Sequence, residues 1–486
     1  MQIVLRGAAA GYEAEHTARI FFPGAEKATQ IPEEGDFVLA VSHEKTDFVL
    51  LRLNSALFWR TAVRTPEQDA EYSLCRLLYG LLREQTGQNP PWGMMTGVRP
   101  VRIIHDLRAM GATEAEIEDR FLRHFACTPQ KFSLARGIAD LQRPVLEGAD
   151  PMDCSVYAGI PFCPTRCSYC SFVSRTVGDK ATRALVQPYV DNLCRELTAI
   201  RQTADRCGLR IRTFYIGGGT PTSLSAAQLE QLMSHIAATF DLASLDEYTV
   251  EAGRPDCTDP EKLRIIKQYG ATRISINPQT FSDEVLHNIG RRHTAQDIID
   301  CFAAARSAGH DNINMDLIAG LPGDTVEGFT HSLEQTIALA PENITVHTLT
   351  LKRASNLVVE HRAAAYDDVA AMLSRCDALH QAGYHPYYLY RQKGTLQNLE
   401  NIGWAKPGRE CLYNIYIMEE IHTILSAGAG GSTKLVIPGK RHGKIERIFN
   451  FKYPTEYIDR FEEILARKKG VEDFYERCAA QTLCKP

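Results

Sequence analysis

Short apolar runs rich in β-branched residues alternate with amphipathic segments through the middle of the chain, and this alternation constrains the fold more than any other feature. Six such runs lie between residue 154 and about residue 350. They read SVYAGIPF, TFYIGGG, EYTVEA, RISINPQ, NINMDLIAG and NITVHTLTL. Nearly continuous apolar strands that are separated by helices are typical of a parallel sheet covered by helices.

The segments between these runs carry the start signals of helices. The signals are Ser225 with Gln228, Thr294 with Asp297, and Asp259 before Pro260. Right-handed crossovers curl such a sheet toward a barrel, but six strand and helix units fall short of the eight that close a TIM barrel. We therefore predict an α/β fold, a partial (β/α)6 TIM-like barrel whose gap admits a large substrate.

The chain before the barrel follows a different pattern. Residues 1 to about 60 alternate apolar and polar side chains between turn-like breaks, which indicates a small antiparallel sheet. Thr65 has the features of an N-cap, with Pro66 at the first helical position and Gln68 completing a capping box, so we expect a helix to begin there. A stretch rich in Gly, Pro and Asp at residues 146 to 153 indicates a domain boundary.

These patterns divide the chain into three predicted domains. We expect an N-terminal α+β domain at residues 1–150, the barrel at 151–385, and a mostly helical region at 386–486 that covers the substrate. The last region begins with aromatic and basic residues and continues through the glycine-rich SAGAGGSTK. The N-terminal domain carries no motif chemistry, and a lid, a partner surface or structural support all fit it.

Composition excludes several classes of function. The 486 residues carry a formal net charge of -5 with acidic and basic side chains interspersed, so we expect no nucleic-acid partner. The first residues lack the pattern of a secretory signal, and no stretch approaches the length of apolar sequence that a membrane-spanning helix needs. We therefore expect a cytoplasmic protein without a transmembrane segment.

Three of the fourteen cysteines lie within eight positions, in GIPFCPTRCSYCSF. Cys163, Cys167 and Cys170 follow the first predicted strand, at the face where barrel folds keep their active sites. Zinc prefers four protein ligands, or three and a water, and no second Cys or His pair at matching spacing lies nearby. A [4Fe-4S] cluster usually has four cysteine ligands, so three would leave one iron free to bind another molecule. The spacing favours the cluster over zinc.

Glycines and polar residues follow the next predicted strands. YIGGGTPT comes after the second one, where glycines allow a close approach of a ligand to the backbone and Thr220 offers a hydroxyl group. A tight strand-to-helix turn explains this stretch equally well by itself, but its place beside the cysteine loop favours a ligand contact. Glu251, Gln279, Arg291 and Asp316 follow later strands, where they suit ribose hydroxyls, an ammonium group and a carboxylate.

The spacing CxxxCxxC, with the aromatic Tyr169 just before the third cysteine, resembles the radical S-adenosylmethionine (SAM) superfamily. The resemblance implies that the free iron binds the amino and carboxylate groups of S-adenosylmethionine. It also implies that an electron from the cluster breaks the sulfonium to give a 5'-deoxyadenosyl radical, while the protein orients the reactants and excludes water.

Longer motifs narrow the resemblance. YAGIPFCPTRCSYC, GGGTPT, INMDLIAGLPGDT and ENIGWAKPGRECLYN resemble the oxygen-independent coproporphyrinogen III oxidase family, over about residue 90 to about residue 435. WGMMTGVRP makes the chain most similar to the Z-type coproporphyrinogen dehydrogenase branch. The resemblance implies an enzyme that decarboxylates two propionates of coproporphyrinogen III to give protoporphyrinogen IX. It also implies an external electron donor such as flavodoxin or ferredoxin.

The same resemblance assigns cofactor contacts by position. Tyr157, Gly218 and Glu251 would contact the S-adenosylmethionine on the cluster, and Tyr169 lies beside it. The positions that match contacts to a second S-adenosylmethionine are Gly219, Thr220, Gln279, Arg291 and Asp316.

Position 172 departs from the oxidases, which tend to read CxxxCxxCxC where this chain has Phe172. The missing cysteine is not one of the three cluster ligands, so cluster chemistry survives its absence. Phenylalanine here also resembles the heme-chaperone branch, so a protein that binds and delivers heme is the alternative. In such a protein His347, His361 or His385 would be a candidate axial ligand of iron. Another radical reaction on a tetrapyrrole, such as methyl transfer with ring opening, is a third hypothesis.

A substrate with four carboxylates needs cationic partners, and arginine suits carboxylates because its donors form a fork. The candidates in the last predicted strand and the C-terminal segment are Lys352, Arg353, Arg391, Lys393, Lys406 and Arg409.

Overall fold

The computed structural model describes residues 1–352, 354–359, 367–439 and 443–483, and it divides the chain into two compact units. The first unit comprises residues 1–137 together with 391–400, and the second comprises 138–390 together with the chain from residue 401 onward. Among the described helices none has the length and apolar character to cross a membrane.

The first unit contains a five-stranded sheet in the order β2-β1-β3-β4-β5. The antiparallel pairing predicted for this region is confirmed for β3, β4 and β5, whereas β1 pairs in parallel with both β2 and β3. Helix α1 makes the crossover that this parallel pairing requires. The bounds are β1 Gln2–Arg6, α1 Tyr12–Phe21, β2 Glu26–Ala28, β3 Phe37–His43, β4 Thr46–Leu53 and β5 Ala56–Val63.

Helices complete the first unit, but the first of them starts later than the sequence indicated. The predicted N-cap at Thr65 is wrong, because α2 begins at Ala70 and the carboxylate of Asp69 accepts the amide N–H of Tyr72 at 2.7 Å. The amide of Thr65 does donate to the side chain of Gln68, yet this contact closes only a turn before the helix. The bounds are α2 Ala70–Thr86, α3 Pro100–Ala109 and α4 Glu114–Asp119; α5, Pro129–Glu147, begins in the first unit and ends in the second.

The second unit holds all six predicted strands as one parallel array in the order β6-β9-β10-β11-β12-β13. Nearly every side chain in these strands is buried, which explains their continuous apolar character. The bounds are β6 Asp153–Ile160, β9 Arg210–Gly218, β10 Glu247–Gly253, β11 Arg273–Ile276, β12 Ile313–Ala319 and β13 Asn343–Thr348.

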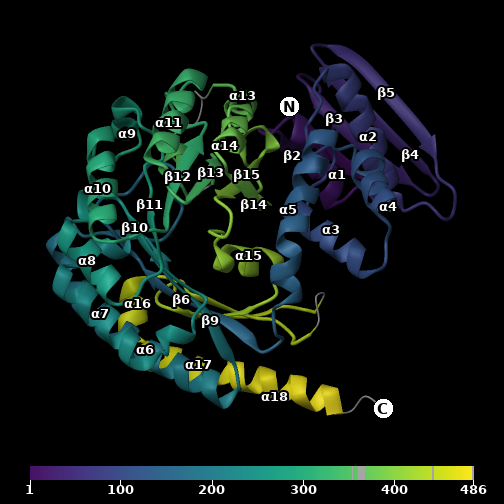
Figure 1. Ribbon diagram of the computed structural model, residues 1–486. Coiled ribbons are helices and arrows are strands. Elements are labelled where there is room, and N and C mark those ends of the chain that lie inside the picture. Colours follow the sequence, from purple (N-terminus) through teal and green to yellow (C-terminus); the bar gives the residue numbers. More distant parts are fainter. Residues whose placement is uncertain (353, 360–366, 440–442, 484–486) are drawn as a thin grey trace. The chain divides into compact units, whose positions relative to one another are not determined.

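Crossover helices line the outer side of this curved sheet (Figure 1). The predicted capping boxes at Ser225 and Thr294 and the cap at Asp259 are confirmed. The bounds are α6 Lys180–Arg206, α7 Ala226–Thr239, α8 Pro260–Gln268, α9 Asp283–Asn288, α10 Ala295–Ser307, α11 Val326–Leu339, α12 Asn356–Val359, α13 Val369–Ser374 and α14 Asp377–Gln381.

The chain beyond residue 385 contributes strands as well as the predicted helices. β16 pairs in parallel with β6 and adds a seventh strand to the array, while β15 pairs antiparallel with β13. Helix α15 lies on the inner side of the curved sheet (Figure 1). The bounds are β14 His385–Arg391, β15 Glu400–Ala405, α15 Leu412–Glu419, β16 Thr423–Ala427, β17 Ser432–Leu435, β18 Glu446–Phe449, α16 Pro454–Asp459, α17 Phe461–Arg467 and α18 Lys469–Leu483.

A glycine-rich loop, residues 428–431, follows β16 and packs on the end of β6. Gly428 has a φ of +93°, and a Cβ atom there would lie 2.4 Å from the carbonyl oxygen of Gly159. All four amides of the loop donate within the protein, to the Glu196 carboxylate, the Tyr189 hydroxyl and the carbonyls of Phe451 and Gly428. The loop therefore joins structural elements and presents no set of amides to a ligand.

Candidate functional site

The cysteine loop begins where β6 ends. Cys163 lies in the short strand β7 (Phe162–Cys163), which pairs with β8 (Arg175–Thr176), and the chain then turns through Cys167 and Cys170. The amide of Cys170 donates to the carbonyl of Cys167 at 3.1 Å, and the amide of Val177 donates to the carbonyl of Cys163 at 3.0 Å. These bonds hold the three cysteines on one short loop at the carboxyl end of the sheet.

None of the three cysteines forms a disulfide. The thiols lie close enough to one another for the charge of one to affect the ionisation of its neighbour. Burial raises the pKa of both Cys163 and Cys170. Across the part of the chain that the structure describes, no three His, Cys, Asp or Glu side chains gather tightly enough to share one metal ion.

The glycine stretch at the end of β9, residues 217–219, packs directly on the cysteine loop. A Cβ atom at Gly219 would lie 2.8 Å from Cys163 Sγ and 2.5 Å from the carbonyl oxygen of Phe162. The hydroxyl of Thr220 donates to Cys163 Sγ at 3.6 Å, and Gly218 has a φ of +116°. The glycines therefore bring the backbone against the thiols, as a cluster held by this loop and a ligand beside it would need.

Arg291 and Tyr169 lie together under the same loop. The guanidinium of Arg291 is buried and donates to the Tyr169 hydroxyl at 3.2 Å and to the carbonyl of Asn277. Its charge also acts on Cys167. A second buried guanidinium, that of Arg254, donates to Cys167 Sγ at 3.7 Å. Sequence reasoning missed Arg254, and its only signal was its place directly after the third strand of the barrel.

Glu251 stands at the end of β10 with its carboxylate turned to the glycine stretch. The hydroxyl of Tyr215 donates to it at 2.7 Å, and a Cβ atom at Gly217 would lie 3.0 Å from its carboxyl carbon. Burial raises the pKa of Glu251 to about 7, against the lowering effect of the Tyr215 hydrogen bond and with a further rise from the charge of Asp316. This carboxylate therefore changes charge near neutral pH.

Asp316 and Gln279 meet beside Glu251. Gln279 has a φ of +71° and bridges to β12, because its amide donates to the carbonyl of Asp316 at 2.8 Å. Burial alone would raise the pKa of Asp316, but contacts with His347 and Asn314 outweigh it and lower the pKa. A left-handed conformation at a residue other than glycine is strained and is often retained for function.

Tyr157 lies in β6, six residues before the first cysteine. Its ring stacks on that of Tyr215 at 6.0 Å between centroids and on that of Tyr413, from α15, at 6.4 Å. The rings of Tyr215 and Tyr413 lie 4.6 Å apart. The three tyrosines form an aromatic wall on the inner side of the sheet below Glu251.

The geometry agrees with the known proteins that the chain resembles. Residues 157–336 match the Radical SAM superfamily. The chain is 35% identical over 487 residues to the oxygen-independent coproporphyrinogen-III oxidase-like protein HemZ of Bacillus subtilis, covering 96% of each chain. It belongs to the oxygen-independent coproporphyrinogen III oxidase-like family of radical SAM proteins. The predicted family and fold class are confirmed.

This radical SAM protein is also similar to a heme chaperone and to a coproporphyrinogen III oxidase of known structure. It is 32% identical to the heme chaperone HemW of Lactococcus lactis, over 66% of this chain and 79% of the relative. The coproporphyrinogen III oxidase HemN of Escherichia coli, described as a radical SAM enzyme, shares the fold at a TM-score of 0.50 and 22% identity. That match covers 67% of this chain and 72% of the other.

The predicted cationic residues of this family member do not gather at one place. Lys406 donates to the carbonyl of Ala340, and Arg409 lies 3.8 Å from Asp311. Ala340 and Asp311 precede β13 and β12, so both cations lie at the amino ends of the strands. They therefore lie at the opposite end of the strands from the cysteine loop, and their role as substrate contacts stays a prediction.

The other predicted cations and histidines divide between the units. Arg391 and Lys393 belong to the first unit, where Arg391 donates to three backbone carbonyls. Lys352 follows β13 at the carboxyl ends of the strands, with its Nζ atom 5.8 Å from the centroid of the Phe172 ring. Arg353 and His361 lie outside the described residues.

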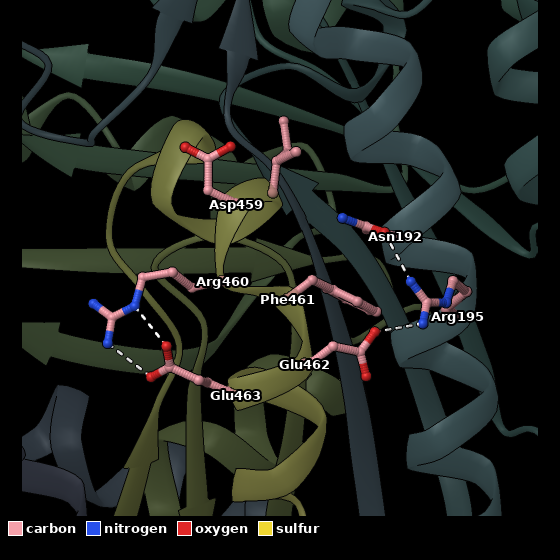
Figure 2. Close-up of a pocket in the computed structure, with 8 residues that line it drawn as sticks. Asn192, Arg195, Asp459, Arg460, Phe461, Glu462 and Glu463 are labelled. Carbon is pink, nitrogen blue, oxygen red and sulfur yellow. Dashed lines mark hydrogen bonds and ion pairs between the residues drawn. The ribbon is translucent and has the colours of Figure 1, made fainter.

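A surface pocket of about 330 Å³ lies where α6 meets α16 and α17 (Figure 2). Arg195 pairs with Glu462 and Arg460 with Glu463, each at 2.7 Å, so these charges neutralise one another. Its lining contains none of the residues of the cysteine loop.

Proposed function

We propose that the protein catalyses the oxygen-independent oxidative decarboxylation of two propionate groups of coproporphyrinogen III, giving protoporphyrinogen IX. One observation carries the proposal: a single loop with three cysteines lies at the carboxyl ends of a parallel, TIM-like sheet, and its first thiol packs against a glycine stretch. The full-length similarity to a coproporphyrinogen-III oxidase-like protein supports the choice of substrate.

The donor set fits a [4Fe-4S] cluster and S-adenosylmethionine. Cys163, Cys167 and Cys170 would hold three irons and leave the fourth for S-adenosylmethionine. Gly219 fits this role because a side chain at that position would occupy the space beside Cys163 Sγ. When bound, the two cofactors would supply the one-electron chemistry that removes a hydrogen atom from the substrate. An external donor such as flavodoxin or ferredoxin would provide the electron.

The polar side chains around the loop would orient S-adenosylmethionine. Glu251, fixed by the Tyr215 hydroxyl, presents a carboxylate that accepts hydrogen bonds from an ammonium or hydroxyl group. Asp316 is held by Asn314 at 2.7 Å and faces His347 at 3.7 Å, which aims its carboxylate at the same space. Gln279 and Arg291 complete the set that would bind a second S-adenosylmethionine.

Each round of the reaction removes one hydrogen atom from the β-carbon of a propionate. The bond to the carboxylate then breaks, carbon dioxide leaves, and one electron passes to an external acceptor, so a vinyl group remains. The reacting carbon must sit within about 3 to 3.5 Å of the atom that takes its hydrogen. The tyrosine wall of Tyr157, Tyr215 and Tyr413 would exclude water from this space.

Phe172 and Lys352 are the substrate contacts that the structure supports best. The Phe172 side chain is 66% exposed although it is large and apolar, and Lys352 lies over its ring. A flat tetrapyrrole would stack on the ring, and one of its carboxylates would pair with the ammonium group.

Binding and delivery of heme is the second candidate, favoured by Phe172 and by the similarity to heme chaperones. The described histidines give it little support. His347 faces Tyr390 through Nδ1 at 3.3 Å and Asp316 through Nε2 at 3.7 Å, so both ring nitrogens are engaged. His385 pairs with Glu410 at 2.6 Å, next to Arg409 at the amino ends of the strands.

Anaerobic reconstitution tests the proposal. The chain is loaded with iron and sulfide, reduced, and incubated with S-adenosylmethionine and coproporphyrinogen III, and mass spectrometry follows 5'-deoxyadenosine and the vinyl product. We expect both products. Formation of 5'-deoxyadenosine without vinyl product contradicts the choice of substrate, and a stoichiometric Soret band on addition of heme to such a chain supports the chaperone.

A further inference from the structure

Arg254 directly follows β10 and is held in one orientation. Its side chain is 4% exposed, and it pairs with the carboxylate of Asp256 through Nε at 2.9 Å and Nη2 at 2.7 Å. Asp256 is itself 3.5 Å from Nδ1 of His293. A guanidinium that is clamped by a bidentate carboxylate has little freedom to turn.

The remaining nitrogen of this guanidinium points into the cysteine loop. Nη1 donates to the carbonyl of Thr165 at 3.1 Å and to Cys167 Sγ at 3.7 Å. With one N–H from Nε and one from Nη2 on Asp256, four of the five N–H groups of Arg254 are used inside the protein. Arg254 is therefore committed to the loop and is not arranged to bind a substrate.

The three cysteines differ in what faces them. Cys163 receives a hydrogen bond from the neutral hydroxyl of Thr220, and Cys170 receives one from the backbone amide of Phe172. Cys167 alone of the three receives its hydrogen bond from the guanidinium of Arg254. The charge of Arg291 also acts on Cys167, so two buried guanidinium groups act on this thiol, while the charge of Arg254 also reaches Cys163 and that of Arg166 reaches Cys170.

We propose that Arg254 is a positioning residue that raises the reduction potential of the [4Fe-4S] cluster through Cys167. This inference rests on the cluster of the proposed function and not on the tetrapyrrole. Reduction adds negative charge to the cluster and its thiolates. A fixed cation that donates to a ligand sulfur stabilises that charge, and more strongly in a buried site than in water.

The test compares reconstituted Arg254→Met, Arg254→Lys and wild-type chains. Methionine removes the charge and the donors at similar length, and lysine keeps the charge but loses the fork. Arg264→Met is the matched control, because Arg264 is an exposed arginine of α8 whose Nε donates to the carbonyl of Pro260. A potentiometric titration without tetrapyrrole follows the electron paramagnetic resonance signal of the reduced cluster, and iron per chain is measured in parallel.

At the wild-type midpoint potential, we expect the ratio of reduced to oxidised cluster in Arg254→Met to fall about tenfold, which is about 59 mV for a one-electron couple. The ratio for Arg254→Lys should lie between those of Arg254→Met and wild type, and the ratio for Arg264→Met should equal that of wild type. Asp256→Asn keeps the arginine and removes the carboxylate that neutralises it, so its midpoint potential should not fall below that of wild type.

An Arg254→Met chain with full iron and the wild-type midpoint overturns the inference. Loss of iron from all three variants of the clamp overturns it as well, because Arg254 would then be only an anchor of the loop. Failure to form vinyl product would contradict the proposed function and leave this result standing, since the titration contains no tetrapyrrole.

Discussion

The two glycine stretches beside β6 look alike in sequence and differ in what surrounds them. Residues 217–219 form the end of β9 and the first position after it, residues 428–431 follow β16, and β9 and β16 are the two neighbours of β6. The missing Cβ atoms of the first stretch would meet a thiol and a carboxylate. That of Gly428 would meet the backbone of Gly159 and the hydroxyl of Tyr189. The chemistry of the neighbours, and not the glycines, separates a ligand site from a structural joint.

Gly219→Ala should have the largest effect, because its Cβ atom would overlap Cys163 Sγ and the carbonyl of Phe162. We expect iron per reconstituted chain to fall at least tenfold, with a far-ultraviolet circular dichroism spectrum like that of wild type. Iron analysis and that spectrum check the prediction. Retention of full iron by this variant would show that the first stretch is also only a joint.

Lys468→Met tests the stretch at residues 428–431 through Glu196, the buried carboxylate that binds it. Glu196 accepts from the amide of Gly428, and Lys468 is its buried cationic partner. Removal of one partner of a buried ion pair destabilises a protein by about 3 kcal/mol or more. Urea unfolding should show this loss, while the folded fraction binds iron at the wild-type stoichiometry. Unchanged stability would contradict the assignment of this network as structural.

Gly428→Ala should also affect the structural stretch at residues 428–431, with a smaller loss of stability than Lys468→Met. Its positive φ and its approach to the carbonyl of Gly159 make alanine strained, which costs about 1–3 kcal/mol. We expect a lower midpoint of thermal unfolding and an unchanged midpoint potential of the cluster. A change in S-adenosylmethionine affinity in this variant would place residues 428–431 in the ligand site after all.

Tyr215→Phe and Tyr189→Phe form a matched pair with the smallest expected effects. The hydroxyl of Tyr215 lowers the pKa of Glu251, so its loss should move that pKa above about 7. The affinity for S-adenosylmethionine should then fall several-fold at pH 7 and recover only at higher pH. Binding measured from pH 6 to 9 checks this.

Tyr189→Phe is the control of that pair. Its hydroxyl joins Gly159 and Ala429 and touches no expected ligand contact, so stability should fall by about 1 kcal/mol with the affinity unchanged. Equal pH profiles for the two variants would remove Glu251 from the ligand site.

The six barrel strands and their helix caps could be predicted because their signals are local. An apolar run such as NINMDLIAG or a pair such as Ser225 and Gln228 needs no knowledge of its partner. Thr65 misled the prediction because Asp69, four residues later, also offers a side chain to a helix start. Strand β16 was missed because only its pairing with the distant β6 identifies it.

The site residues could be predicted where they directly follow a barrel strand, and not where distant pairing places them. Residues placed by strand ends, such as Glu251 and Asp316, lie where the alternation put them. The sequence could not place Lys406 and Arg409, because only the antiparallel pairing of β15 with β13 shows that the chain returns to the amino ends there. Arg254 was missed because no pattern distinguishes an arginine after a strand from a solvated one.

The pairing of β6 with β16 has a consequence for synthesis on the ribosome. Residue 423 follows residue 153 by 270 positions, so the strand that leads into Cys163 keeps a bare edge until those residues have emerged. Such long-range pairing is slow, and an unpaired edge invites association with other nascent chains. We therefore expect iron and sulfide to be assembled on this loop only after β16 has paired with β6.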